Sequence, residues 1–330
     1  GLLMDKGADP NAVDDKKRSA LMFAATDGYA KIVDLLLEKG ARVDLRSDKG
    51  RTALHLAAIK GRTSVVKSLV AKKADIEAMD PYGMTPLLAA IGVDHWDTAR
   101  FLVQSGANVT AKLHKTHLTP LMFAARNPDP ALAALLIERG ADVNALNQGG
   151  VTPLMNAATS GNDAVVGLLL KKGARINHLS RVGWTALHYA VLNDHVDVAS
   201  LLIDNSIDIN AAGGQAVAPL ILAVVRKNLA AVKLLLQAGA DINIRSNAGF
   251  APLMAAASTK GADEILGYLL AQKADASLKD SRGRSALDWA RQKNIQEAVD
   301  LLDESALKKM HEKEGDAGIQ ALLDYYASQK

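Results

Sequence analysis

Residues 152–177 read TPLMNAATSGNDAVVGLLLKKGARIN, a pattern that predicts two short helices joined by a tight turn. Thr152 is a good N-cap because its hydroxyl can accept a hydrogen bond from an otherwise unpaired amide, and Pro153 suits the first helical position. Apolar residues at helical spacing follow, and Gly161 ends this first helix. A second, strongly apolar helix ends at Gly173, where a left-handed C-cap is expected. The stretch is therefore one helix-turn-helix unit.

The same unit recurs along the chain at a nearly constant spacing of 33 or 34 residues. Each first helix begins at a Ser, Thr or Ala that is followed by Pro or Ala and then by Leu. These cap positions are Ser19, Thr52, Thr85, Thr119, Thr152, Thr185, Ala218, Ala251 and Ser285. Helices this short are marginal alone, so each unit must bury its apolar faces against its neighbours. The period predicts an all-α solenoid of stacked repeats with β-hairpin-like loops between them.

Composition limits the possible core and the possible partners. Length alone would favour two or three globular domains for 330 residues, but the unbroken period favours one elongated array. With 49% hydrophobic and 4% aromatic residues, the core must consist of Ala, Leu, Ile and Val. A net charge of +3 selects neither nucleic acid nor membrane, and the lack of cysteine excludes disulfides and thiolate metal sites. Apolar runs are too short for a transmembrane segment.

Four stretches resemble the ankyrin repeat family, and the resemblance extends from residue 1 to about residue 302. They are TALHLAA at 52–58, GADVNA at 140–145, TPLMNAA at 152–158 and TALHYAV at 185–191. The resemblance implies helices in two layers, with projecting hairpins that form a concave groove. The absence of cysteine and the frequent TPLM in place of TPLH resemble bacterial members more than animal ones.

The repeats divide the chain into three expected parts. Residues 1–14 align with the end of a repeat, so its first helix is expected to lie upstream. Residues 15–302 hold nine repeats. Residues 303–330 form a C-terminal helical extension, because Ile319, Leu322, Leu323 and Tyr326 have amphipathic helical spacing. The extension either caps the last repeat or covers a binding surface.

A few repeats depart from the pattern. One extra residue is expected in the loop at 106–118, and another in the turn at 258–263. The loop at 211–219 lacks the usual Asp and Gly pattern and is predicted to be the loosest. Three repeats carry Lys73, Ser206 and Lys273 where five others have the C-cap glycine, so a left-handed residue there costs more or the turn differs. The ninth repeat has Ala306 at this position, so its last helix is expected to continue.

The chemistry-bearing residues favour a protein without catalytic activity, cofactor or metal. His55 and His188 occupy the fourth place of the TPLH-type motif, where the family resemblance implies a bond from the imidazole to the neighbouring loop backbone. His114 and His117 could form a two-histidine clip, but a structural metal site normally takes four ligands. Sequence signatures of nucleotide-binding loops, zinc proteases and serine hydrolases do not occur.

A binding function is predicted from the residue just before each cap, which we call the tip row. Its members are Arg18, Arg51, Met84, Leu118, Val151, Trp184, Val217, Phe250 and Arg284. The family resemblance implies that this position faces the groove and makes contacts. Six consecutive members are apolar, and arginines stand at both ends. Apolar surface rimmed by charge is typical of a partner site, and Trp, Tyr and Arg are common hot-spot residues.

The expected protein-binding residues combine much of this row with other groove positions. They are Tyr82, Met84, Leu118, Trp184, Leu192, Phe250, Arg18, Arg51 and Arg284. Val151 and Val217 are instead expected to align adjacent hairpins. The expected partner is another protein with an apolar segment and an acidic rim. Nucleic acid is not expected, because the basic residues are spread out and mixed with acidic ones. A monomer is expected.

Two other interpretations stay open at this point. The repeats could be a regulatory or targeting segment of a larger enzyme that is truncated upstream, or they could bind an anionic polymer or a lipid headgroup. The sequence does not separate cytoplasm from periplasm or secretion, because the native N-terminus is expected to lie upstream of Gly1.

Overall fold

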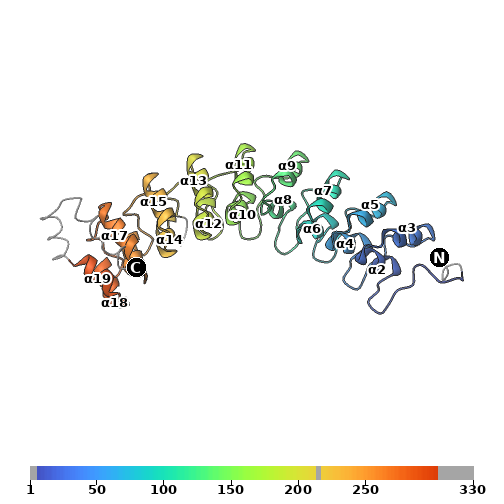
Figure 1. The fold of residues 1–330 in the computed structure, drawn as a ribbon, viewed down its shortest axis with the longest axis horizontal. Coiled ribbons are helices and arrows are strands. Elements are labelled where there is room, and N and C mark those ends of the chain that lie inside the picture. Colours follow the sequence, from blue (N-terminus) through green and yellow to red (C-terminus); the bar gives the residue numbers. More distant parts are fainter. Residues whose placement is uncertain (1–5, 213–216, 304–330) are drawn as a thin grey trace. The chain divides into compact units, whose positions relative to one another are not determined.

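The computed structural model describes residues 6–212 and 217–303, in which α-helices follow one another in pairs (Figure 1). Its contacts form two compact units, residues 1–157 with 167–174, and residues 158–166 with 175–330. Two helices, α10 (Pro153–Thr159) and α11 (Asp163–Lys171), contribute residues to both units.

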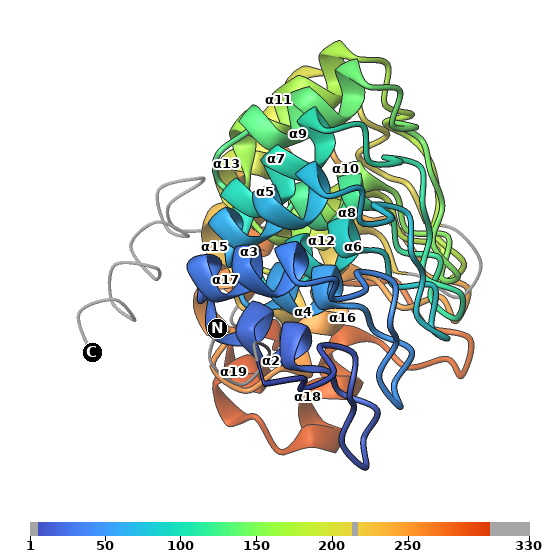
Figure 2. The same ribbon diagram turned by 90° about the vertical axis from the view of Figure 1, so that its right-hand side faces the viewer.

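The first unit consists of two layers of helices. One layer contains α2 (Ala20–Asp27), α4 (Ala53–Ile59), α6 (Pro86–Ile91) and α8 (Pro120–Ala124). The other contains α3 (Ala30–Glu38), α5 (Thr63–Ala71), α7 (Trp96–Gln104) and α9 (Ala131–Glu138). Each helix packs against its pair partner and against the corresponding helix of the next pair. The loops that connect successive pairs, coloured blue to green, project on one side of these helices (Figure 2).

The second unit repeats this arrangement. Its first helices are α12 (Ala186–Leu192), α14 (Pro219–Val225), α16 (Pro252–Ala257) and α18 (Ala286–Lys293). Its second helices are α13 (Val196–Asp204), α15 (Leu229–Gln237), α17 (Asp263–Ala271) and α19 (Gln296–Leu302). Each first helix again packs against the next first helix, and each second helix packs against the next second helix. The predicted all-α fold of stacked helix pairs is confirmed. In the part of the chain that the structure describes, no helix is long and apolar enough to cross a bilayer.

The core between the layers is built from small and branched aliphatic side chains. In α4, Leu54, Ala57 and Ala58 are completely buried, and α5 adds Val66 and Leu69. Alanines at two of these positions let the helix axes approach closely, because an alanine side chain adds little to the distance between packed helices. The low aromatic content is therefore matched to closely packed layers.

The first helices begin at the predicted caps. The hydroxyls of Ser19, Thr52, Thr85, Thr119 and Thr152 each accept a hydrogen bond from the amide three residues further on, at 3.2–3.4 Å. Ala218 and Ala251 have the same extended backbone but no side chain that can accept this bond. Local sequence thus determines where these helices start, and two repeats lack one stabilising bond.

The two extra residues lie where the sequence predicted them. In an ordinary loop the Asp80 amide donates to the Met84 carbonyl at 3.0 Å. In the lengthened loop the Leu113 amide donates to Leu118, one residue further, at 3.1 Å. The second extra residue widens the turn between α16 and α17. The loop predicted to be loosest contains residues 213–216, and the predicted C-terminal helix contains residues 304–330; both lie outside the described residues, as do residues 1–5.

Hydrogen bonds between neighbouring loops hold successive repeats in register. The Asp48 amide donates to the Lys16 carbonyl at 2.9 Å, and an equivalent bond joins later loops. Farther from the tips, the Asn210 side chain accepts from the Asp241 amide at 3.0 Å, and Asn243 accepts from Asp275 at 2.9 Å. These bonds fix where each loop tip lies relative to its neighbour.

Candidate functional site

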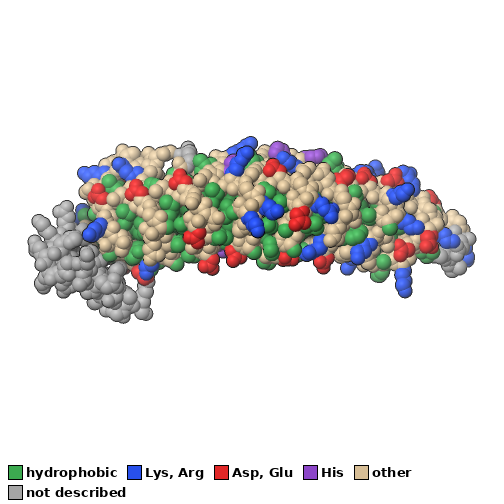
Figure 3. All heavy atoms as spheres, turned by 90° about the horizontal axis from the view of Figure 1, so that it is seen from above, with side chains coloured by type: hydrophobic (Ala, Val, Ile, Leu, Met, Phe, Trp, Pro, Cys, Tyr) green, Lys and Arg blue, Asp and Glu red, His purple; other side chains and the backbone are tan. Residues whose placement is uncertain are grey.

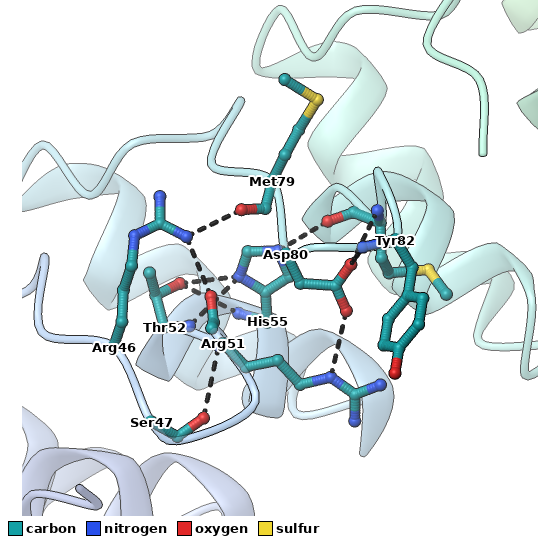
Figure 4. Close-up of polar contacts among 10 residues, drawn as sticks. Arg46, Ser47, Arg51, Thr52, His55, Met79, Asp80 and Tyr82 are labelled. Atoms are coloured by element: carbon teal, nitrogen blue, oxygen red, sulfur yellow. Dashed lines mark hydrogen bonds and ion pairs between the residues drawn. The ribbon is translucent and has the colours of Figure 1, made fainter. Parts of the chain in front are cut away.

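Seven of the loop tips are shaped by a polar side chain five residues before the cap. In the loop drawn in Figure 4, Asp80 Oδ1 accepts from the amides of Tyr82 and Met84 at 2.9 and 3.0 Å. Between these two residues, Gly83 has a φ of 76°, which glycine adopts without strain. The turn therefore sets the directions in which Tyr82 and Met84 leave the backbone.

Tyr82 and Met84 differ in how much of the residue is exposed to solvent. Tyr82 is 60% exposed, and its ring extends away from the Asp80 carboxylate (Figure 4). Met84 is only partly exposed. Its carbonyl accepts a hydrogen bond from His55 in the preceding repeat at 2.8 Å. Tyr82 is thus the more accessible group at this tip.

The two motif histidines connect a helix start to the next loop, as the family resemblance implied. Nδ1 of His55 lies 3.3 Å from the Thr52 amide, which donates to it, so Nε2 carries the proton that bonds Met84. His188 makes the same bonds to Thr185 and, at 2.9 Å, to the Val217 carbonyl. Burial lowers the pKa of both imidazoles, and that of His188 falls to about 4. Both rings are therefore neutral structural groups.

The three arginines of the tip row each form an ion pair with an aspartate at the base of a loop, which is the residue's own loop for Arg18 and Arg284 and the next loop for Arg51. The closest N–O distances are 2.7 Å for Arg18–Asp14, 3.4 Å for Arg51–Asp80 and 2.8 Å for Arg284–Asp280. These pairs orient the guanidinium groups and neutralise part of their positive charge. This neutralisation was not predicted from the sequence.

A second set of side chains lies beside the tip row, and the sequence interpretation missed it. These residues stand four positions after each cap, and we call them the helix row; its aromatic members are Phe23, Phe123, Tyr189 and Trp289. The Arg18 guanidinium lies 4.4 Å from the Phe23 ring, and that of Arg284 lies 3.8 Å from the Trp289 ring. Aromatic residues at one fixed repeat position were the signal that could have revealed this row.

Trp184 belongs to an aromatic cluster in the second unit. Its ring is stacked with His188 at 6.0 Å and meets Tyr189 edge-on at 5.5 Å. Trp184 and Tyr189 are half-buried, and His188 is buried. Leu192, one turn further along α12, is also partly exposed. Trp184 therefore contributes to packing and also presents surface to solvent.

Phe250 and Arg284 are brought together by Trp289. Phe250 meets Trp289 edge-on at 5.2 Å, and the Trp289 indole donates to Asp280 at 3.1 Å. Burial alone would raise the pKa of Asp280, but hydrogen bonds from the amides of Arg284 and Arg282 and from the Arg284 guanidinium lower it to about 2. Asp280 is therefore ionised at neutral pH.

Leu118 lies at the end of the lengthened loop and is partly exposed. The residue before it, His117, has a φ of 57°, where ordinary tips have glycine. Tyr82, Met84, Leu118, Arg18 and Arg51 belong to the first unit. Trp184, Leu192, Phe250 and Arg284 belong to the second. Each unit thus presents its own share of the predicted residues.

Charge on the surface is mixed. On the face drawn in Figure 3, Lys and Arg side chains are interspersed with Asp and Glu and with hydrophobic groups. Within residues 6–212 and 217–303, His, Asp and Glu do not gather in groups of three or more that could hold a metal ion. His114 of the lengthened loop instead packs against Gly83. A Cβ atom added to Gly83 would lie 2.5 Å from the His114 ring.

Comparison with known proteins identifies the repeats. The family model described as ankyrin repeats matches residues 1–80, 43–112, 62–147, 121–213 and 218–312. None of the curated proteins compared with the chain is a detectable match. Ankyrin repeats are generally protein-interaction modules and typically lack catalytic activity. The matches cover most of the sequence, and the chain belongs to the ankyrin repeat family.

Proposed function

We propose that this chain is a non-catalytic scaffold that binds another protein through its loop tips and the adjacent first helices. The observation that carries the proposal is the pairing of the tip row with the helix row. Aromatic rings and guanidinium groups from the two rows lie within 6 Å of one another and remain partly exposed. Aromatic and Arg side chains held in place before binding lose little conformational freedom on association.

The partner that fits this surface has an apolar segment with acidic residues at its edges. In the first unit the apolar part would contact Met84 and Leu118, with Tyr82 beside Met84. In the second unit it would contact Trp184, Leu192 and Phe250. The acidic edges would meet Arg18, Arg51 and Arg284, which still expose 40, 28 and 25% of their side chains. Because each of these arginines is already paired with an aspartate, we expect them to contribute to orientation more than to affinity.

The test is to select peptides from a random displayed library against the whole chain and to measure their affinity for variants. Tyr82→Ala, Trp184→Ala and Phe250→Ala should each be assayed singly. We expect at least one of them to weaken each selected peptide by about 30-fold, which corresponds to about 2 kcal/mol.

Tyr29→Ala is the matched control. Tyr29 is 57% exposed, close to the 60% of Tyr82, but it lies at the end of α2 that is opposite the loop tip. If Tyr29→Ala weakens the peptides as much as the three tip variants do, or if none of the tip variants has an effect, binding does not use the proposed surface. Circular dichroism of each variant should separate lost affinity from lost fold.

A further inference from the structure

A pocket of about 590 Å³ opens between the last two loops of the described chain. Its walls come from the loop that precedes α16, from the loop that precedes α18 and from α18 itself. The volume is within the range of sites that enclose small ligands or single side chains. All of its lining residues belong to the second unit.

The apolar part of the pocket is held rigidly. Phe250 and Trp289 meet edge-on, and the Trp289 ring is fixed by its hydrogen bond to Asp280 and by the Arg284 guanidinium 3.8 Å from its centre. Arg284 is fixed in turn by Asp280 and by a 2.9 Å hydrogen bond to Gln292. Rings that are already in position can receive an apolar group with little loss of side-chain entropy.

The rim of the pocket has an excess of positive charge. Arg284 and Asp280 neutralise each other at 2.8 Å. Arg282 and Lys293 also line the pocket, both are exposed, and neither forms an ion pair with a described residue. A ligand that enters the pocket therefore meets an apolar wall and two cations that have not been neutralised.

We propose that this pocket binds one large apolar side chain of a protein partner together with a carboxylate next to it. The inference rests on the proposed scaffold function and names the chemistry of the segment that docks at this end. An aromatic side chain fits best, because a third ring can pack against the edge and face that Phe250 and Trp289 present. The carboxylate would lie between Arg282 and Lys293, where bidentate bonding to the guanidinium is available.

Trp184 provides an internal comparison. It pairs with Tyr189 as Arg284 pairs with Trp289. At the positions that correspond to Arg282 and Lys293, however, this repeat has Val182 and Asn193. An apolar ligand with a carboxylate should therefore prefer the Trp289 pocket, whereas an apolar ligand without charge should discriminate less.

The experiment uses the full chain labelled with 5-fluorotryptophan. The three tryptophans give three ¹⁹F signals, and a Trp289→Phe variant assigns the signal of Trp289. The probes are N-acetyl-L-phenylalanine, which carries a carboxylate, and its neutral amide. We expect the carboxylate probe to shift the Trp289 signal and to bind about five-fold or more tightly than the amide. The Trp184 signal should move much less.

An Arg282→Gln, Lys293→Gln double variant supplies the decisive comparison. Both side chains are exposed, so the fold and the starting Trp289 signal should be unchanged. The preference for the carboxylate probe should fall to less than about two-fold. The proposal is overturned if the preference persists, if Trp184 responds as strongly as Trp289, or if acetate alone produces the same shift, since that would indicate an anion site without an aromatic subsite.

These results are separable from the test of the scaffold function. If Trp289 does not respond while library peptides still lose affinity in the Tyr82→Ala or Trp184→Ala variants, the pocket assignment is wrong and the scaffold function stands. If Trp289 responds as expected while no peptide depends on the tip variants, the pocket exists but the scaffold function is contradicted.

Discussion

Lys73, Ser206 and Lys273 hold a left-handed backbone where five other repeats place a C-cap glycine. Their φ values are 60°, 64° and 65°, so the turn is kept. For a residue with a Cβ atom, this conformation costs roughly 1–2 kcal/mol. A glycine would avoid that cost but would lose roughly 0.5–1 kcal/mol in conformational entropy on folding, which offsets part of the gain. The sequence left two alternatives open at these positions. The structure has the first of them: the turn is unchanged, and a residue that is costlier than glycine adopts the left-handed conformation.

Lys73→Gly and Ser206→Gly should therefore each raise the free energy of unfolding by roughly 0.5–1 kcal/mol. Urea unfolding measures the change. Gly140→Ala is the control with the opposite sign: its φ is 96°, and an added Cβ would have no atom within 4 Å, so only the backbone term is altered. A loss of stability in the glycine variants would show that the lysine and serine side chains contribute more than the strain they carry.

Helix starts and loops are coupled by the two buried histidines, which makes the stability of the helix pairs depend on pH. In the folded chain Nδ1 accepts from a backbone amide and Nε2 donates to a carbonyl, so both rings must be neutral. In the unfolded chain an imidazole has a pKa of 6.5. Between that value and about 4 the unfolded chain binds the additional proton, and stability therefore falls as the pH falls.

His188 alone should lower the free energy of unfolding by about 2 kcal/mol between pH 7 and pH 5. His188→Met should remove most of that pH dependence, because methionine fills the same position in other repeats, as at Met22 and Met254, and does not titrate. Denaturant unfolding at the two pH values measures it. His114→Gln, which changes an exposed histidine, should leave the dependence intact. Equal pH dependence in His188→Met and the parent would exclude His188 as its source.

Stacked pairs make stability a sum of local terms, because the described helix pairs make their main contacts with their neighbours in the series. In the second unit, α15 packs against α14 and against the second helices on either side, α13 and α17. Leu235 of α15 is completely buried. A cavity at this position removes contacts that no distant pair can replace.

Leu235→Ala should lower stability by roughly 2–5 kcal/mol, as truncation of a buried leucine does. Hydrogen exchange should speed up most in α13 to α17 and much less in α3 to α5, which belong to the first unit. The equivalent Leu69→Ala in α5, where Leu69 is also fully buried, should reverse this distribution. Uniform acceleration in both variants would indicate a single cooperative unit instead of local stacking.

The sequence by itself determined where the helices begin, the family and the repeat in which each extra residue falls. These features depend on contacts within a few residues, such as the hydroxyl of Thr85 and the amide of Leu88 at 3.2 Å, so the local residue pattern is sufficient.

Only the tertiary structure decided which candidate binding residues remain exposed and which are already paired with another side chain. The ion pair of Arg51 with Asp80, the pairing of Trp184 with Tyr189 and the pocket beside Trp289 all depend on where a loop folds back onto a helix or onto the next loop. The depressed pKa of His188 likewise follows from burial under the loop of the following repeat. Apart from the Trp184–Tyr189 pair, these placements depend on packing between segments distant in sequence, because side-chain charge and exposure are fixed only when neighbouring repeats meet.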